Sequence, residues 1–598
     1  MMIKRANAKR SSRFACLALA VVLATMVHAA VVRAAEQQIP TDARGLPQWT
    51  IKEWTDFPIT VELGSRDELE ALLRAVPIAS FDRDQVRVIR DGPLSSRLLF
   101  RPRVTEAEEA ALLEHGYRTA RLPDLDRQGR EAAERTWAGQ SATGNEALAR
   151  GDKAVWHTYA EIVTILAQIG TDHPMLARTF TWGATVQGRE LRGLVISADV
   201  SNTTAEPEVR LSSTIHGNEP VGAEMLLYLA DYLTDHYGQV GYEDVTYLVD
   251  HYEIHLLPMY NPDGNVADSR YNANGVDLNR NFLEPAGTQP VLQLENAHFE
   301  AHARAHHFVV SINGHGGATV ANYPWDHTYT RAPDDAAVQK LSLEYSTYNL
   351  PMYNGDFPQG ITNGADWYVI TGSLQDWSYD QTDCIDVTVE LQDTSWPPAS
   401  QLDGLWNDNR ESLMHYVKAA RYGINGVVTS AATGLPLAAI VTVAGNAKPV
   451  HTDPAHGDYY KLLNTGTYDL TFAATGCVSQ TVSGVATTWG TPTVLNVALL
   501  PDAPTGVPGA APLAFTLDPV RPNPARGGAL TVRFTLPTTA PARLELLDVS
   551  GRRITSQDVG AGQHTLDLGR GRQLAPGLYL VRLTQGANTR TTRVAVLQ

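Results

Sequence analysis

The chain has 598 residues, more than a single hydrophobic core accommodates, so we expect several domains. Its hydrophobic fraction of 43% and charged fraction of 19% are those of an ordinary globular protein, which argues against a disordered or fibrous chain. The formal net charge of -17 argues against nucleic acid as a partner, because binding to phosphates requires clustered lysine and arginine.

The first residues have the layout of a signal peptide. Basic residues within Lys4–Arg13 precede an apolar run, Phe14–Val27, and small residues follow it. We therefore expect residues 1–35 to be a signal peptide and the mature protein to be secreted or at the cell surface. No later stretch reaches the ~20 apolar residues that a transmembrane helix needs, so no membrane span is expected. Cys384 and Cys477 fall in different predicted domains and are expected to be free thiols.

Residues 36–150 are predicted to form a small α+β module followed by a linker. Capping boxes at Ser65 and Thr105 indicate the starts of two helices, and the apolar alternation around them predicts strands. The polar stretch Arg127–Gly151 has little hydrophobic pattern and is predicted to be the linker. A stable accessory domain and a removable pro-segment are equally compatible with this module.

Residues 151–422 alternate helical patterns with apolar strands, which predicts a three-layer α/β domain built on a mixed sheet. The expected strands include Glu208–Ile215, Tyr252–Leu257, Phe308–Ile312 and Ile385–Leu391. Short strands separated by turns predict a β-sandwich over 423–500, and a second one over 513–598. Proline, glycine and alanine dominate residues 501–512, which are predicted to be a linker.

The densest chemical signal is the pair His216 and Glu219, directly after a predicted strand. Pro220 suits the first turn of a helix, which is predicted over Val221–His236. Loops that leave strands are where sites form in α/β sheets. Imidazole and carboxylate are ligands for zinc, and three protein ligands would leave a position for water. A third ligand is therefore expected elsewhere in the domain.

The histidines at helical spacing, His298, His302 and His306, are one source of a third ligand. Glu300 does not follow the first of them directly, as the metalloprotease helix motif requires, so this stripe is interpreted as a packed or solvated helix face. His315 is the better candidate, because it follows a predicted strand and glycines flank it.

Five sequence blocks resemble the zinc carboxypeptidase family in order and spacing. They run from His216 to Glu219, Tyr260 to Gly264, Arg270 to Phe282, His315 to Asp326 and Gly364 to Leu391. The resemblance is to the regulatory branch of carboxypeptidases N, E, D and M, because Gly423–Val428, Gly457–Leu463 and Gly466–Tyr468 resemble the transthyretin-like domain that follows the catalytic domain in that branch. It implies a carboxypeptidase-like fold and one zinc ion per catalytic domain. Residues 513–598 contain Arg521–Pro524, Leu547–Arg552 and Ala575–Tyr579, and through these motifs they resemble the C-terminal sorting domains of bacterial type IX secretion substrates. This resemblance implies secretion machinery as a partner; a β-sandwich spacer or adhesion module is the alternative.

The resemblance implies a role for each matched residue. His216, Glu219 and His315 would bind zinc, and Asp277 would orient one zinc histidine. Glu390 would be the general base and later the general acid, Arg270 would stabilise the oxyanion, and Tyr368 would close over the substrate. Asn279 and Arg280 would hold the substrate's terminal carboxylate. Asp326 and Gln375 would line the pocket for the final side chain and favour lysine or arginine.

The predicted function is therefore a zinc carboxypeptidase that removes one C-terminal residue from peptides or proteins. One alternative keeps the fold and metal but trims peptidoglycan stem peptides; Asp326 and Gln375 argue against it, because that substrate does not demand a basic final side chain. Another alternative is a non-catalytic secreted binding or adhesion protein. The presence of Glu390 and Arg270 beside the zinc ligands argues against that reading.

Overall fold

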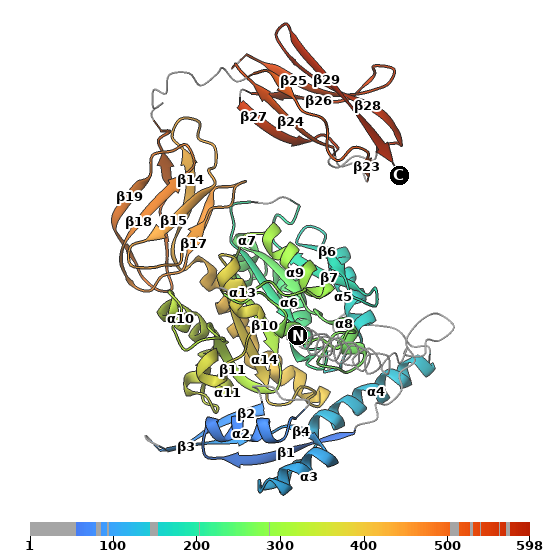
Figure 1. Ribbon diagram of the computed structural model, residues 1–598, viewed down its shortest axis with the longest axis vertical. Coiled ribbons are helices and arrows are strands. Elements are labelled where there is room, and N and C mark those ends of the chain that lie inside the picture. Colours follow the sequence, from blue (N-terminus) through green and yellow to red (C-terminus); the bar gives the residue numbers. More distant parts are fainter. Residues whose placement is uncertain are drawn as a thin grey trace, which may run out of the picture. The chain divides into compact units, whose positions relative to one another are not determined.

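The computed structural model describes residues 55–78, 85–92, 95–143, 154–201, 204–285, 287–502, 514–526, 530–538, 540–560, 562–569 and 574–597 (Figure 1). The predicted signal peptide lies outside these ranges. The chain divides into two compact units, Met1–Pro501 and Asp502–Gln598. Within the described ranges, no helix has the length and apolar character needed to cross a bilayer. Cys384 and Cys477 are both free thiols.

The N-terminal module is one antiparallel sheet with two helices. Its elements are β1 (Asp56–Leu63), α2 (Arg66–Ala75), β2 (Val86–Gly92), β3 (Ser95–Phe100), β4 (Arg103–Thr105), α3 (Glu106–Glu114) and β5 (Thr119–Arg121). The capping box predicted at Thr105 is present, and Gly116 follows α3 with a φ of 86°, which favours glycine. Leucine, isoleucine and valine side chains from the sheet and both helices form a separate core.

The linker predicted over Arg127–Gly151 is wrong for its first part, because α4 (Leu125–Thr143) is a 19-residue helix. Tertiary contacts explain a helix that has little hydrophobic pattern. The guanidinium of Arg130 forms a buried ion pair with Glu134, 2.8 Å long, and lies over the ring of Trp396. Trp137 is buried and its indole N–H donates to the carbonyl of Trp156. Helix α4 therefore packs on the following domain through charged and aromatic side chains.

The central domain contains an eight-stranded mixed sheet in the order β12-β11-β13-β10-β8-β9-β7-β6. The strands are β6 (Ala177–Ala184), β7 (Glu190–Ile196), β8 (Glu208–Ser213), β9 (Glu253–Leu257), β10 (Phe308–His315), β11 (Ala318–Tyr323), β12 (Ile361–Asn363) and β13 (Ile385–Gln392). Strands β13, β10, β8 and β9 are parallel, so their carboxyl ends meet at one edge. The predicted mixed sheet is confirmed.

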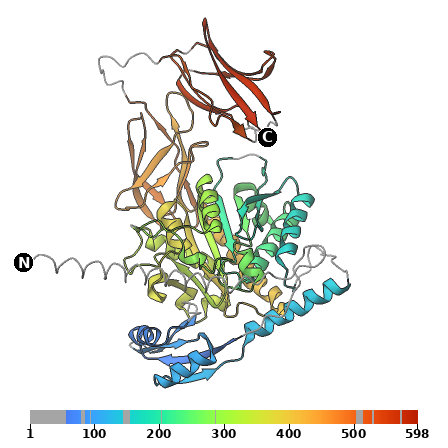
Figure 2. The ribbon, with the colours of Figure 1, turned by 45° about the vertical axis from the view of Figure 1, so that its right-hand side comes forward.

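Helices cover both faces of this sheet (Figure 2). They are α5 (Tyr159–Asp172), α6 (Val221–His236), α7 (Glu243–His251), α8 (Pro262–Val266), α9 (Leu294–Ala305), α10 (Asp335–Ser346), α11 (Leu350–Tyr353), α12 (Gly364–Trp367), α13 (Leu374–Gln381) and α14 (Leu402–Lys418). Helices α5, α6 and α14 contribute to the largest core, and α9 and α13 to a second one that contains Phe299 and Trp377. Two cores on one sheet are what a three-layer α/β domain requires.

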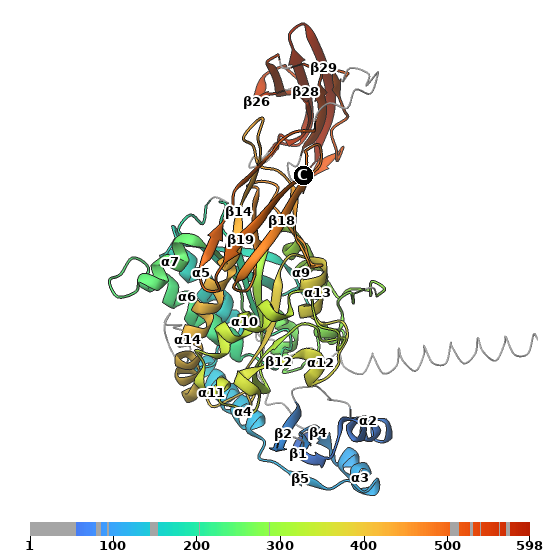
Figure 3. The ribbon, with the colours of Figure 1, turned by 90° about the vertical axis from the view of Figure 1, so that its left-hand side faces the viewer.

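From Gly423 the chain forms two small sheets, in the orders β17-β14-β20 with β21 beside β14, and β16-β15-β18-β19 (Figure 3). The strands are β14 (Gly423–Ser430), β15 (Ala439–Val443), β16 (Val450–His451), β17 (Asp458–Lys461), β18 (Gly466–Ala474), β19 (Gln480–Thr487), β20 (Pro492–Val494) and β21 (Val497–Leu499). They share their own apolar core. A buried ion pair of 2.8 Å between Lys461 and Asp334 links them to the central domain.

The second unit is also all β. Its strands are β22 (Thr516–Leu517), β23 (Ala525–Arg526), β24 (Thr531–Leu536), β25 (Ala542–Asp548), β26 (Arg553–Val559), β27 (Gly562–Asp567), β28 (Gly577–Gln585) and β29 (Asn588–Leu597). They form a sheet in the order β22-β24-β27 and another in the order β23-β29-β28-β25-β26. Valine and leucine side chains of both sheets enclose one core.

Candidate active site

The three predicted zinc ligands lie together at the carboxyl ends of β8 and β10. Nδ1 of His216 is 2.9 Å from one carboxylate oxygen of Glu219, and Nδ1 of His315 is 2.9 Å from the other. All three side chains are buried, and their ligand atoms lie within 4.8 Å of one another. Two imidazoles and one carboxylate form a donor set that fits a catalytic zinc ion. His315 is the last residue of β10 rather than part of the loop expected after it.

The ring nitrogens opposite the ligand atoms also have partners. Nε2 of His216 is 3.3 Å from a carboxylate oxygen of Asp277, and Nε2 of His315 is 2.9 Å from the side-chain amide of Asn313. Because the Asp277 carboxylate can only accept, Nε2 of His216 donates to it, which fixes the orientation of the ring and leaves Nδ1 directed at a metal. The placement of Asp277 agrees with its predicted orienting position.

The loop that carries His216 is held by the block Tyr260–Gly264 and the residue after it. A Cβ on Gly217 would meet the backbone of Gly264 at 2.1 Å, so only glycine allows this close approach. The Asn265 side chain donates to the carbonyl of Gly217, over 3.0 Å. Thr214 has a φ of 61°, a strained value for a β-branched residue, two positions before His216. The surrounding contacts must therefore hold this backbone in place.

Burial and neighbouring charges act in opposite directions on the site's carboxylates. Burial would raise the pKa of the Glu219 carboxyl, but the charges and hydrogen bonds of His216 and His315 outweigh burial and lower it. Burial likewise opposes the ionisation of Asp277, whose pKa is held well below its usual range by Arg270 and His216. Both groups are therefore carboxylates at neutral pH, which is the form that binds and orients metal ligands.

Glu390 lies beside His315 because β10 and β13 are parallel and these two residues are directly paired in register. The Glu390 side chain is only 3% exposed. Arg270 contacts the same group of ligands: its Nη1 is 3.0 Å from Nδ1 of His216, and its Nε donates to Asp277 over 2.9 Å. The structure thus brings a carboxylate and a guanidinium to the same three ligands.

Asn279 and Arg280 belong to a single 3-10 turn, η3 (Leu278–Arg280), which begins next to Asp277. The carboxamide oxygen of Asn279 accepts the backbone N–H of Leu374, over 2.9 Å, so this turn is fixed against the start of α13. Arg280 donates to the carbonyl of Asn279, also over 2.9 Å. This shared turn brings both predicted carboxylate-binding residues to the same side of the site as Asp277.

Tyr368 follows α12 and packs against the core of the N-terminal module. Its ring is partly buried, and burial raises the pKa of its hydroxyl. Next to it, Arg66 of α2 donates to the carbonyl of Ala365, over 3.3 Å. The tyrosine predicted to close over substrate is therefore in contact with the module that precedes the domain.

Asp326 and Gln375 are both fully buried; Asp326 follows β11, and Gln375 lies on α13. The carboxamide oxygen of Gln375 accepts the backbone N–H of Thr388, over 2.9 Å, and Thr388 lies on the same face of β13 as Glu390. Asp326 accepts from the side chain of Asn322, over 3.2 Å, and Asn322 pairs in register with Thr388. These contacts define a buried polar cluster beside Glu390.

Glu284 and Asp376, two further acidic residues that interact with Asp326, were not identified from the sequence. The Asp376 carboxylate accepts the backbone N–H groups of Asp326 and His327 and lies 2.7 Å from the His327 ring. Burial and the charge of Asp376 raise the pKa of Glu284 to about 7, and burial and the charge of Asp326 raise that of Asp376 to about 6. The available signal was proximity to the motifs: Asp376 directly follows Gln375, and Glu284 lies two residues after Phe282.

Comparison with known proteins agrees with this geometry. Residues 162–412 match the zinc carboxypeptidase family model, and residues 520–597 match that of the secretion system C-terminal sorting domain. The chain is 38% identical over 349 residues to carboxypeptidase D of Mus musculus, covering 54% of this chain and 25% of that protein. It is 33% identical over 420 residues to the carboxypeptidase N catalytic chain of Homo sapiens, covering 62% and 89%. The chain belongs to the zinc carboxypeptidase family.

The match spans only about a quarter of the length of the carboxypeptidase D proteins. Among solved structures, carboxypeptidase A from Helicoverpa armigera superposes with a TM-score of 0.50 at 17% identity, covering 61% of this chain and 97% of that one. This likeness confirms the carboxypeptidase-like α/β fold.

Proposed function

We propose that this chain is an exported zinc carboxypeptidase that releases one C-terminal residue, preferentially lysine or arginine, from peptides or proteins. The observation that carries the proposal is the pairing of Glu390 with His315 in register, which sets a buried carboxylate beside the three candidate zinc ligands. A metal-binding cluster alone would serve structure as well as catalysis. A general base beside it is needed only for hydrolysis.

His216, Glu219 and His315 would hold the zinc ion, which when bound would polarise the scissile carbonyl and lower the pKa of water. Glu390 would take the proton of the attacking water and deliver it to the leaving amine. Arg270, fixed by its 2.9 Å contact with Asp277, would donate to the oxyanion that develops in the transition state. Both the proton transfer by Glu390 and the oxyanion contact of Arg270 require a side chain that is held in position before substrate binds.

Recognition of a free C-terminus would fall to Asn279 and Arg280. A guanidinium presents parallel N–H donors that match a carboxylate, which lysine cannot do. The contact between Asn279 and Leu374 holds these residues at a fixed position. Tyr368 would close over the bound residue. A substrate whose terminal carboxylate is blocked as an amide would lose this recognition.

The preference for a basic final residue is supported by the acidity of the pocket. Asp326, Asp376 and Glu284 place three carboxyl groups around it. Among the described residues, Oδ1 of Asn322 and Oγ1 of Thr388 are buried acceptors without a hydrogen-bond partner. A lysine or arginine side chain would supply the missing donors and a balancing charge. The same features disfavour peptidoglycan stem peptides, for which a cationic final side chain is not required.

The outer segments support two further assignments. Contact between Tyr368 and the N-terminal module supports a pro-segment that restrains the site until it is removed. The match of residues 520–597 to a sorting domain supports export, with secretion machinery as the partner of the second unit. We also propose that the two sheets over residues 423–500 form a transthyretin-like domain, because Gly423–Val428 and Gly457–Leu463, the segments that resemble such a domain, contribute β14 and β17.

The test uses purified protein with four matched peptides that end in arginine, leucine, glutamate or arginine amide, with and without a chelator. We expect fastest release of arginine, no cleavage of the amide, and loss of all activity with chelator that zinc restores. Cleavage that is insensitive to the chelator would refute the zinc mechanism. Equal chelator-sensitive rates for arginine and leucine would refute only the pocket assignment. No cleavage, before or after removal of the N-terminal module, would favour a binding protein.

A further inference from the structure

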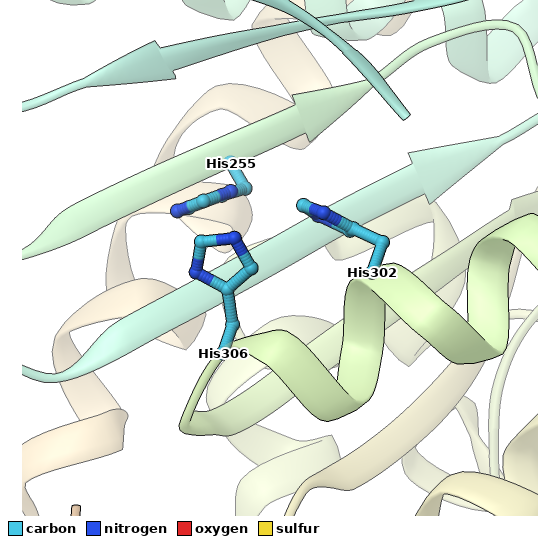
Figure 4. A group of neighbouring side chains, drawn as sticks. All are labelled: His255, His302 and His306. Atoms are coloured by element: carbon cyan, nitrogen blue, oxygen red, sulfur yellow. The ribbon is translucent and has the colours of Figure 1, made fainter. Parts of the chain in front are cut away.

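A second group of histidines lies towards the amino-terminal ends of the parallel strands, away from the candidate active site at their carboxyl ends. His255 on β9 and His302 and His306 from α9 direct their rings at one another (Figure 4). Ring centroids are 4.5 Å apart for His255 and His306 and 4.7 Å for His302 and His306. Strand β8 separates this group from the site: Glu208 starts β8 beside the histidines, and His216 follows its far end. The strand alone spans about 16 Å.

Hydrogen bonds fix the tautomers of two of these rings. Nε2 of His255 is 2.7 Å from a carboxylate oxygen of Glu253, and Nδ1 of His306 is 3.2 Å from one of Glu208. A carboxylate accepts, so each of these nitrogens carries the proton. The other ring nitrogen, Nδ1 of His255 and Nε2 of His306, then has a lone pair available. Metal-bound histidines commonly show this carboxylate contact.

Two ring nitrogens of the group are buried, and neither forms a hydrogen bond to the described residues. Across the described part of the chain, Nδ1 of His255 and Nε2 of His302 have no hydrogen-bond partner. The residues are 1% and 9% exposed. Burial lowers the pKa of both rings, so they are neutral at physiological pH, as a metal ligand must be. Unpaired buried polar atoms are uncommon in folded proteins and call for an explanation.

We propose that His255, His302 and His306 bind a second zinc ion, which holds the end of α9 to β9 and takes no part in hydrolysis. The ligand atoms of the three histidines lie within 4.8 Å of one another. Imidazole suits zinc, and His306, whose side chain is 26% exposed, leaves a side open for water as the fourth ligand. Glu208 and Glu253 balance the charge of the ion, and nearby Arg210 is already paired with Asp386.

Packing of the rings alone is the competing explanation. Phe180 stacks on His302 with ring centroids 5.1 Å apart, so an aromatic cluster would form without metal. That explanation accounts for the stacking but leaves the two buried nitrogens unpaired. His298, the first histidine of the same helical stripe, instead packs against Gly183, where a Cβ would meet its ring at 2.3 Å. The stripe therefore divides into one packing residue and two candidate ligands.

The number of zinc ions bound per full chain distinguishes a second zinc site from packing of the rings alone. The protein is stripped with a chelator, reloaded with zinc, desalted and analysed for bound zinc by elemental mass spectrometry. We expect two ions per chain for the unaltered protein and one for His302→Phe, which keeps the stacking on Phe180. Carboxypeptidase activity of His302→Phe should be unchanged. His315→Gln should also bind one ion, and the double variant none.

The control is His327→Gln, since Glu284, His327 and Asp376 form another group able to bind metal. It should retain two ions. One ion in the unaltered protein, or two in His302→Phe, would overturn the proposal, as would loss of the second ion in His327→Gln alone. If His302→Phe does not fold, His306→Gln replaces it, because this residue is partly exposed and its loss leaves the core intact. Cobalt loading of His315→Gln gives a second readout, a visible absorption spectrum that His302→Phe should abolish.

Discussion

Replacing Glu390 by glutamine tests the central step of the proposed mechanism. Glutamine has nearly the same shape but cannot take a proton from water. General acid–base catalysis contributes about 10²–10⁴-fold, or about 3–5 kcal/mol of the barrier. Glu390 is 3% exposed and lies beside the proposed zinc ligand His315, so bulk water cannot replace it as a base. We therefore expect kcat to fall by about 10³–10⁴-fold, in the upper part of this range.

The assay compares kcat and KM on an arginine-ending peptide, zinc content, and the melting temperature. KM, zinc content and melting temperature should stay near those of the unaltered protein, because Glu390 is not among the ligands. Glu224→Gln is the matched control: it removes another buried glutamate of the domain, one that accepts the backbone N–H of His157 over 2.8 Å. It should change stability but not kcat. A Glu390→Gln enzyme with more than about a tenth of normal kcat would show that the base is another residue.

Three further predictions follow from the same geometry. Arg280→Lys should lower kcat/KM for an arginine-ending peptide about 10–100-fold, because the two-pronged carboxylate contact is lost. An unchanged kcat/KM would contradict the assignment. The ratio of kcat/KM for an arginine-ending peptide over a leucine-ending one should fall as pH drops from about 8 to about 5.5. Glu284 has a pKa of about 7 and Asp376 a pKa of about 6, so their protonation removes negative charge from the proposed pocket. A ratio that does not change with pH would mean that these groups do not face the substrate. Trp137→Ala should lower the free energy of unfolding, measured by urea titration, by about 3–5 kcal/mol, because Trp137 is 3% exposed and its ring packs on that of Trp396. A loss below about 1 kcal/mol would show that α4 does not pack on the central domain.

The predicted strands and helices of the central domain agree closely with the structure because their patterns are strong. Helix α6 runs over Val221–His236, as predicted from Pro220 and the apolar residues behind it. The prediction failed for α4, whose stability comes from Arg130, Trp137 and their contacts with a distant Trp396. A helix that depends on such tertiary contacts has no periodic signal of its own.

Sequence alone identified the family and the candidate ligands, because motif order and spacing survive in a linear chain. It also identified the histidine stripe of α9, but as a helix face. Only the tertiary structure decided which distant residues meet: Glu390 with His315 through strand register, Glu284 with Asp376 in the pocket, and His255 with His302 and His306. The physical reason is that sheet order and register fix contacts between residues far apart in the chain, and local pattern carries no information about either.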